Sequence, residues 1–373
     1  MKENKFLNYV KQIPKRYFIT AFSGMALGLF CTLIAGTIIT MFADWLSGCF
    51  LGEYLSIFGK IAKVLMGAGI GVGIAYKLNA KPLVIFSSAV AGLIGAWALN
   101  IIDGTFVAKA ENMINSGLPG NPIGAYVLSM LTIEVASLYA GKTKFDIIFV
   151  PIGMIILSIL GIYIAWPFIK VIDLFSELLV ILINAGVAVK IIVGIIISVV
   201  MGVLLTMPTS SAAIWIAIAT SNTALENPEV FAIAGGAAVA GCACHMIGFA
   251  VASFRENKWS GLISQGLGTS MLQIPNIMKK PIIMLPEIIA SIISGLVAVL
   301  IDMRCTPAGG GMGTSGLVGV FGVIDATKNV SMFATVFGII VCLFIIPAVV
   351  SFVVSELMRK KNLIEFGDQK LED

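Results

Sequence analysis

The sequence predicts an all-α protein that crosses a membrane many times. Of its 373 residues, 58% are hydrophobic and only 12% are charged, whereas a soluble chain carries about 25% charged residues. The mean hydropathy is +1.02. One water-soluble core cannot hide this much apolar surface, so much of the surface must face lipid. The net charge of +4 is small and scattered along the chain, which argues against nucleic acid as a partner.

Apolar runs of the length that a membrane-spanning helix needs, about 20 residues, recur along the whole chain. The stretch 171–190 mixes polar residues with leucine, isoleucine and valine, and fits either a further span or an interfacial amphipathic helix. The other runs lie near 17–43, 60–78, 83–102, 122–140, 147–169, 191–207, 229–253, 281–301 and 331–355.

Basic residues outside the spans predict the orientation. Lysines and arginines cluster in the first 16 residues and again at 359–361, so both termini are expected in the cytoplasm. An even number of crossings follows, and ten fits best. The first apolar run is too long for the core of a signal peptide and is expected to remain as the first span.

Three segments rich in Gly, Pro, Ser and Thr interrupt the apolar runs of the second half, at 207–213, 264–275 and 305–316. Two of them share a near-repeat, Gly-x-Gly-Thr-Ser, at 266–270 and 311–315. Unpaired backbone cannot face hydrocarbon and is tolerated at that depth only inside protein or beside an aqueous cavity. Transporters use such broken elements to present polar groups to a solute. The pattern favours re-entrant hairpins, with ordinary surface loops as the alternative.

Residues 311–316 also match the GxGxxG spacing of a dinucleotide-binding turn. That site requires a strand before the glycines and an acid about 20 residues after them. Here the preceding run 281–301 is long enough to span a membrane, and the nearest downstream acid, Asp325, comes nine residues after Gly316. The glycines are therefore interpreted as a turn, and no cofactor is expected.

His245 is the only histidine, and it follows Cys242 and Cys244 in the sequence GCACHMIGFA. The Cys-x-Cys-His spacing fits zinc sites poorly and no second ligand pair exists, so no metal is expected. A packed histidine with one hydrogen bond and a polar group facing a solute both remain open. Glu134 and Glu287 lie in apolar stretches, and a buried structural role and a solute contact are equally compatible with each.

The segment QIPNIMKKPIIMLPEI, 273–288, resembles the signature of sugar-transporting IIC subunits of the bacterial phosphotransferase system. The prolines at 275 and 281 keep the spacing of that signature, and the segments MPTSSAA and GGGMGTSGLVG resemble a divergent stand-alone EIIC branch that includes clostridial toxin-regulatory membrane proteins. Ile274 stands where the family has a glutamate that accepts hydrogen bonds from sugar hydroxyls. This departure shifts recognition to neighbouring polar groups or to another solute.

The resemblance implies an EIIC-like fold of about ten helices in a bacterial inner membrane. It divides the chain into a dimer-forming half (1–170), a connecting or amphipathic helix (171–190), a substrate-binding half (191–356) and a cytoplasmic tail (357–373). A homodimer, the lipid bilayer and a soluble IIB-type protein in trans are the implied partners. The candidate solute-binding residues are His245, Thr269, Ser270, Gln273, Asn276, Glu287, Thr314 and Ser315.

The sequence thus predicts a IIC-type permease for a small polar solute, a sugar or a similar molecule, with no chemical step on this chain alone. Two alternatives remain open. One is a membrane sensor of the same fold that binds a ligand without transporting it, and the other is an ion or metabolite facilitator.

Overall fold

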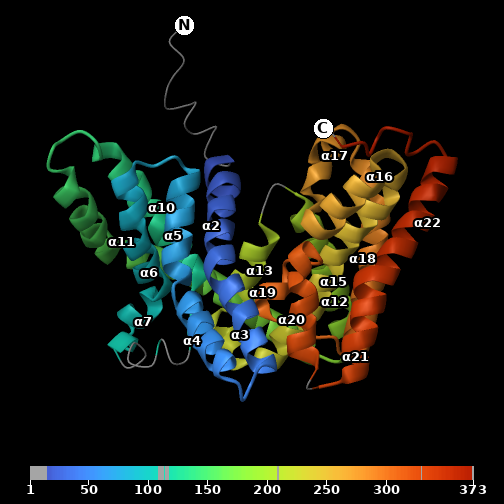
Figure 1. The fold of residues 1–373 in the computed structure, drawn as a ribbon, viewed down its shortest axis with the longest axis horizontal. Coiled ribbons are helices and arrows are strands. Elements are labelled where there is room, and N and C mark those ends of the chain that lie inside the picture. Colours follow the sequence, from blue (N-terminus) through green and yellow to red (C-terminus); the bar gives the residue numbers. More distant parts are fainter. Residues whose placement is uncertain (1–14, 108–112, 114–116, 208–209, 329, 372–373) are drawn as a thin grey trace, which may run out of the picture. The chain divides into compact units, whose positions relative to one another are not determined.

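The computed structural model describes residues 15–107, 113, 117–207, 210–328 and 330–371 (Figure 1). Every regular element in this part of the chain is a helix, which confirms the all-α prediction. The chain divides into two compact units, Met1–Leu174 and Phe175–Asp373, here unit 1 and unit 2. The basic residues Lys2, Lys5 and Lys11, on which the expected orientation partly rests, lie outside the described residues.

The described part of unit 1 is built from helices. Asn121 begins one of them, because its Oδ1 accepts from the Ile123 and Gly124 amides at 2.9 and 3.0 Å and Pro122 occupies the first turn. The elements are η1 (Lys15–Ala21), α2 (Phe22–Leu29), η2 (Phe30–Ile34), α3 (Ala35–Trp45), α4 (Phe50–Val64), α5 (Met66–Lys77), α6 (Pro82–Ala96), α7 (Ala98–Ile102), α10 (Pro122–Tyr139) and α11 (Asp146–Asn184), whose residues after Leu174 belong to unit 2.

Glycines set the spacing of the helices in unit 1. A Cβ on Gly28 would overlap the backbone of Gly69, so α2 and α5 touch backbone to backbone. Gly92 of α6 meets the carbonyl of Gly67 in the same way. Small residues at such contacts let membrane helices approach closely and gain van der Waals contact.

Seven helices among the described residues are long and apolar enough to cross a membrane, and the bent pair α4 and α5 makes an eighth if it counts as one span. The expected count of ten stays a prediction. Residues 147–169 and 171–184 lie in one helix, because α11 runs without a break for 39 residues to Asn184, and α12 begins at Val187. At 1.5 Å per residue α11 extends about 58 Å, well beyond the ~30 Å of a bilayer core.

Unit 2 is centred on α15, which contacts α12, α18 and α22. Most of α15 is buried, including the run from Ala234 to Met246. The elements after α11 are α12 (Val187–Thr206), α13 (Ser211–Ala219), α14 (Asn222–Glu226), α15 (Pro228–Ala252), α16 (Phe254–Ile263), η3 (Ser264–Gly268), η4 (Ser270–Gln273), α17 (Ile274–Lys279), η5 (Pro281–Met284), α18 (Leu285–Leu300), α19 (Pro307–Gly310), η6 (Ser315–Leu317), α20 (Val318–Thr327), α21 (Met332–Phe337), η7 (Gly338–Ile345) and α22 (Ile346–Lys360).

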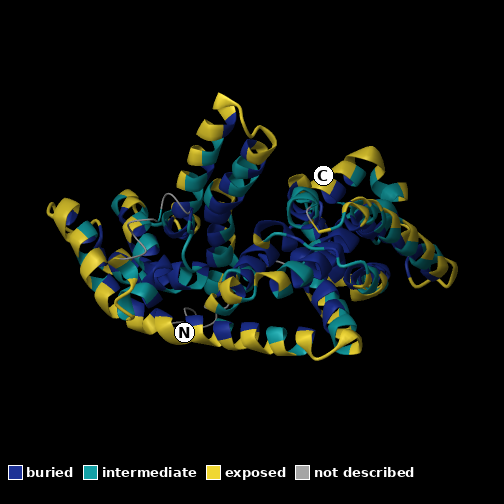
Figure 2. Ribbon diagram, turned by 90° about the horizontal axis from the view of Figure 1, so that it is seen from below, coloured by how far each residue is buried: buried dark blue, intermediate teal, exposed yellow. Residues whose placement is uncertain are grey.

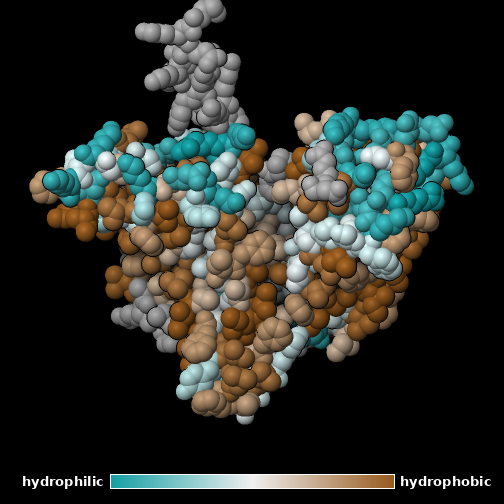
Figure 3. Space-filling model, turned by 45° about the horizontal axis from the view of Figure 1, so that its top comes forward, coloured by the Kyte–Doolittle hydropathy of each residue, from teal (hydrophilic) through white to brown (hydrophobic). Residues whose placement is uncertain are grey.

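The surfaces of both units suit lipid. Large hydrophobic side chains are exposed on the outer faces of the helices, for example Phe149 and Ile156 of α11 and Phe352 of α22. In Figure 2 the buried residues gather inside each unit and the exposed ones lie outside. Figure 3 shows hydrophilic residues at the end of unit 2 that carries α16, α17 and the C-terminal residues, with hydrophobic surface beyond them.

Candidate functional site

Residues 305–327 form a hairpin that enters unit 2 along α15. The Cys305 amide donates to the Ala232 carbonyl at 2.9 Å, near the start of α15. Further along the hairpin, a Cβ on Gly313 would lie 2.8 Å from the backbone carbon of Cys242. Ten residues of helix separate Ala232 from Cys242, about 15 Å of depth. The chain then returns, because the Thr306 amide donates to the Gly322 carbonyl at 3.3 Å.

The glycines of this hairpin serve its turn and its packing. Gly313 and Gly316 adopt φ of +57° and +51°, which glycine reaches without strain. Gly311 lies against the backbone of α13, and its carbonyl accepts from Ser211 Oγ at 2.7 Å. Since helix α18 rather than a strand precedes the motif, the interpretation of GxGxxG as a turn is confirmed.

A second glycine-rich turn meets the hairpin from the opposite end of α15. Gly266, in η3, lies against Ile247 and Ala250 of that helix. Thr314 Oγ1 of the hairpin donates to the Gly266 carbonyl at 2.5 Å, and Thr314 is fully buried. The two near-repeats therefore touch inside unit 2.

A buried hydrogen-bonded chain adjoins this meeting point. Thr206 Oγ1, at the end of α12, lies 2.9 Å from His245 Nδ1 and 2.8 Å from Ser270 Oγ. All three side chains, here the histidine cluster, have no exposed surface. His245 Nε2 has no hydrogen-bond partner and packs on Gly202 of α12. The cluster therefore carries an unused hydrogen-bonding position beside the two turns.

Gln273 and Asn276 belong to a different cluster, next to the C-terminal tail. Gln273 Nε2 donates to Gln265 Oε1 at 2.8 Å and to the carbonyl of Gln369 at 3.0 Å. Asn276 Nδ2 donates to Gln273 Oε1 at 2.8 Å and to the carbonyl of Lys370 at 2.9 Å. The side-chain amides of Gln273 and Asn276, predicted from the sequence to bind a solute, thus donate hydrogen bonds to the tail instead.

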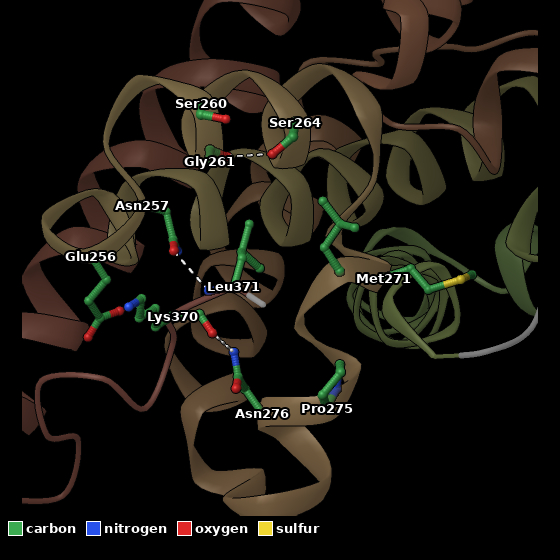
Figure 4. A pocket seen from close by; sticks show the side chains of 11 residues that line it. Glu256, Asn257, Ser260, Gly261, Ser264, Met271, Pro275, Asn276, Lys370 and Leu371 are labelled. Carbon is green, nitrogen blue, oxygen red and sulfur yellow. Dashed lines mark hydrogen bonds between the residues drawn. The ribbon is translucent and has the colours of Figure 1, made fainter. Parts of the chain in front are cut away.

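The three side chains that hold the tail, here the tail clamp, are Asn257, Gln273 and Asn276. Asn257 uses both ends of its amide: Nδ2 donates to the Gln369 carbonyl at 2.8 Å and Oδ1 accepts from the Leu371 amide at 2.9 Å. A pocket of about 590 Å³ lies between the clamp and the tail, lined by residues of α16, η3, η4 and α17 together with Lys370 and Leu371 (Figure 4).

The remaining candidate residues lie apart from the histidine cluster or are already paired. Glu287 is fully buried in the first turn of α18, and neither carboxylate oxygen has a hydrogen-bond partner. Thr269 Oγ1 accepts from the Met271 amide at 3.1 Å and so caps η4. Ser315 is half-buried in the turn of the hairpin. The structure brings together His245, Ser270 and, through Gly266, Thr314.

Comparison with known families decides the assignment. The family model described as "Phosphotransferase system, EIIC" matches residues 19–371. The chain belongs to this family. As an EIIC protein it is a membrane permease component of the phosphotransferase system. No curated protein and no solved structure matches the chain.

The tail of this EIIC protein is also held by an ion pair. Lys280 Nζ lies 2.6 Å from Asp368 Oδ2. Burial opposes ionisation of Asp368, but the Glu365 amide and the Lys280 ammonium outweigh it and hold the pKa of this carboxyl below its usual value. The contribution of the pair to folding is therefore complete above the pKa of an unfolded aspartate, and is lost as pH falls through the lower folded value.

Replacing Asp368 with asparagine is expected to destabilise the EIIC protein at pH 7 and to have a smaller effect at pH 3. Both side chains are partly exposed, so the difference at pH 7 is modest. Thermal unfolding of the wild type and of Asp368→Asn between pH 7 and pH 3 measures it. A difference between the two proteins that stays constant across this range would contradict the assignment.

Sequence reasoning missed three residues of these clusters in the EIIC chain. Thr206 joins His245 to Ser270, yet it stands at the end of an ordinary apolar run. Gln265 links Gln273 to Ser253, and Gln369 of the tail has no exposed surface. The near-repeat at 266–270 was the one signal for Gln265, and nothing in the sequence signals that the tail folds back.

Proposed function

We propose that this EIIC chain binds a small, uncharged, polyhydroxyl solute, a sugar or a similar molecule, at the histidine cluster and moves it across the membrane. The observation that carries the proposal is the meeting of two glycine-rich turns beside a buried imidazole with an unpaired nitrogen. His245, Ser270 and Thr314 are the residues expected nearest the solute, and Thr206 positions His245.

The chemistry of the cluster supports a neutral solute. Neutral imidazole and hydroxyl groups donate and accept hydrogen bonds as sugar hydroxyls do, and backbone carbonyls accept them, all without a net charge. A charged solute would need a compensating charge in this buried place. Gln273 and Asn276 reach the solute only if the tail leaves the clamp, because their amides are otherwise engaged.

The distribution of basic residues supports a cytoplasmic position for the clamp. The basic residues near the clamp lie on α16, on α22, in the tail or directly after α17: Arg255, Lys258, Lys280, Arg359 and Lys370. Cytoplasmic segments carry an excess of such residues. We place both termini in the cytoplasm of a bacterial cell, a IIB-type partner on this face, and a homodimer formed by the N-terminal half, as the family implies.

A panel of neutral sugars and polyols is expected to raise the unfolding temperature of the purified protein, since a ligand that binds only the native state stabilises it. Thr206→Val, which keeps the shape of the side chain but loses its hydrogen bonds, should weaken binding of the active solute by about tenfold. Thr132→Val is the matched control, because Thr132 is a buried threonine of unit 1 that donates to the Leu128 carbonyl at 2.9 Å.

Two outcomes would count against the proposal. Stabilisation by charged solutes alone would exclude a neutral sugar, and equal weakening by both threonine variants would exclude the histidine cluster as the site. Reconstitution in vesicles separates transport from sensing: a solute that binds but does not cross favours the membrane-sensor alternative.

A further inference from the structure

A second buried polar group lies where α15, α18 and α22 meet, on other residues than the histidine cluster. Glu287 of α18 and Ser351 of α22 have no exposed surface, and Ser355, one turn further along the same face of α22, is 1% exposed. Within the described part of the chain, neither oxygen of Glu287 has a hydrogen-bond partner, and neither serine hydroxyl has one. Three unpartnered polar side chains in one buried region require an explanation.

Gly248 of α15 brings Glu287 and Ser351 to one place. A Cβ on Gly248 would lie 2.5 Å from Ser351 Oγ and 2.9 Å from Glu287 Cγ. The carboxyl group and the hydroxyl therefore border the same point on α15.

Among the described residues, no cation compensates the carboxyl of Glu287. It forms no ion pair, and an unpaired carboxylate costs several kcal/mol in a buried place. The other ionisable groups on the elements around α18 do not pair with Glu287. Lys190 of α12 pairs with Asp302, Glu229 of α15 pairs with Arg304, and on α22 Glu356 pairs with Arg255 and Arg359 pairs with Glu256. Lys360 is exposed at the end of α22, and none of the described buried residues Cys242, Cys244, His245 and Cys342 forms an ion pair.

We propose that Glu287 and Ser351 form a proton-binding site in unit 2, with Ser355 one helical turn further along α22. One carboxylate oxygen takes up a proton from water, and the resulting neutral acid has one O–H donor and accepting oxygens, which match hydroxyls that both donate and accept. A bound metal ion fits less well, because a cation such as Ca²⁺ takes six to eight oxygen ligands and the unpartnered side chains supply four.

The proton site has a consequence for transport, and this part rests on the proposed function. The proton is retained while α15, α18 and α22 are packed together and is released if water reaches the carboxyl. A movement of unit 2 that admits water to this junction would therefore release the proton.

Infrared spectroscopy of the purified full chain tests the site without any solute. At pH 7 the wild type is expected to show the carbonyl-stretch band of a protonated carboxylic acid, and Glu287→Gln is expected to lose it. Ser351→Ala should shift this band without removing it, because the acid stays protonated but changes its hydrogen bond. Glu134→Gln is the control and should leave the band unchanged, since Glu134 is ion-paired with Arg16 at 2.6 Å.

The outcomes are distinct. Absence of the band in folded wild-type protein, or its persistence in Glu287→Gln, would overturn the proton site. Stabilisation by sodium ions that requires Glu287, without an acid band, would replace the proton by a metal cation and also overturn it. None of these results depends on whether a sugar binds at the histidine cluster, so the two proposals fail separately.

Discussion

Replacing Gly241 with alanine is expected to lower the stability of unit 2 by about 3 kcal/mol or more, at the upper end of overpacking effects. Gly241 lies in the middle of α15, and a Cβ there would overlap the carbonyl of Ser198 on α12. A side chain could rotate away, but a helix backbone cannot, so the two helices would have to separate. Helix propensity alone predicts the opposite sign, since alanine is favoured over glycine within a helix by about 1 kcal/mol.

Thermal unfolding of Gly241→Ala and Gly268→Ala, each in the purified full chain, separates packing from propensity. A Cβ on Gly268 would have no atom within 4 Å, so this control should unfold near the wild-type temperature. If both variants unfold at the same temperature, the close approach of α12 and α15 is not what makes Gly241 necessary.

Replacing Arg359 with leucine is expected to cost about 3–5 kcal/mol and to release the tail, because it leaves a buried carboxylate without its partner. Arg359 Nη1 lies 3.2 Å from Glu256 Oε1, and the Glu256 side chain has no exposed surface. Arg359 also donates to Gln369 Oε1 at 3.0 Å. The unfolding temperature reports the loss of stability, and protease cleavage within residues 361–371 reports the release.

Arg255→Leu is the matched control for this ion pair. Arg255 pairs with Glu356 at 2.8 Å, but its side chain is 58% exposed, and exposed pairs contribute about 0–1 kcal/mol. The tail should remain protected in this variant. Equal destabilisation by the two substitutions would show that burial does not distinguish the pairs.

The fold was largely predictable because bilayer crossing imposes a length and a composition on each helix. The apolar run 229–253 corresponds to α15 at Pro228–Ala252, and 281–301 corresponds to η5 and α18 at Pro281–Leu300. Hydrophobicity does not show whether a long helix continues through a polar patch. Asp173 and Glu177 therefore suggested a change of element within 171–190, where α11 in fact continues.

The candidate site was predictable only where a local signal existed. The repeated Gly-x-Gly-Thr-Ser indicated two turns, and Thr314 does contact Gly266. Contacts between residues far apart in the chain left no such signal. Gln273 and Gln369 are 96 positions apart, and their pairing depends on a tail that reads as an ordinary charged terminus.

The tail clamp has a consequence for which sequence changes the protein tolerates. Asn257, Gln273 and Asn276 donate hydrogen bonds to the main-chain carbonyls of Gln369 and Lys370, not to their side chains. Any residue at 369 or 370 presents the same main-chain carbonyl, so these hydrogen bonds constrain the residue type there only weakly. The donors at 257, 273 and 276 are side-chain amides, so the same bonds require those residue types. Evolutionary drift is therefore expected to be faster at Lys370 than at Asn257, although the two lie side by side.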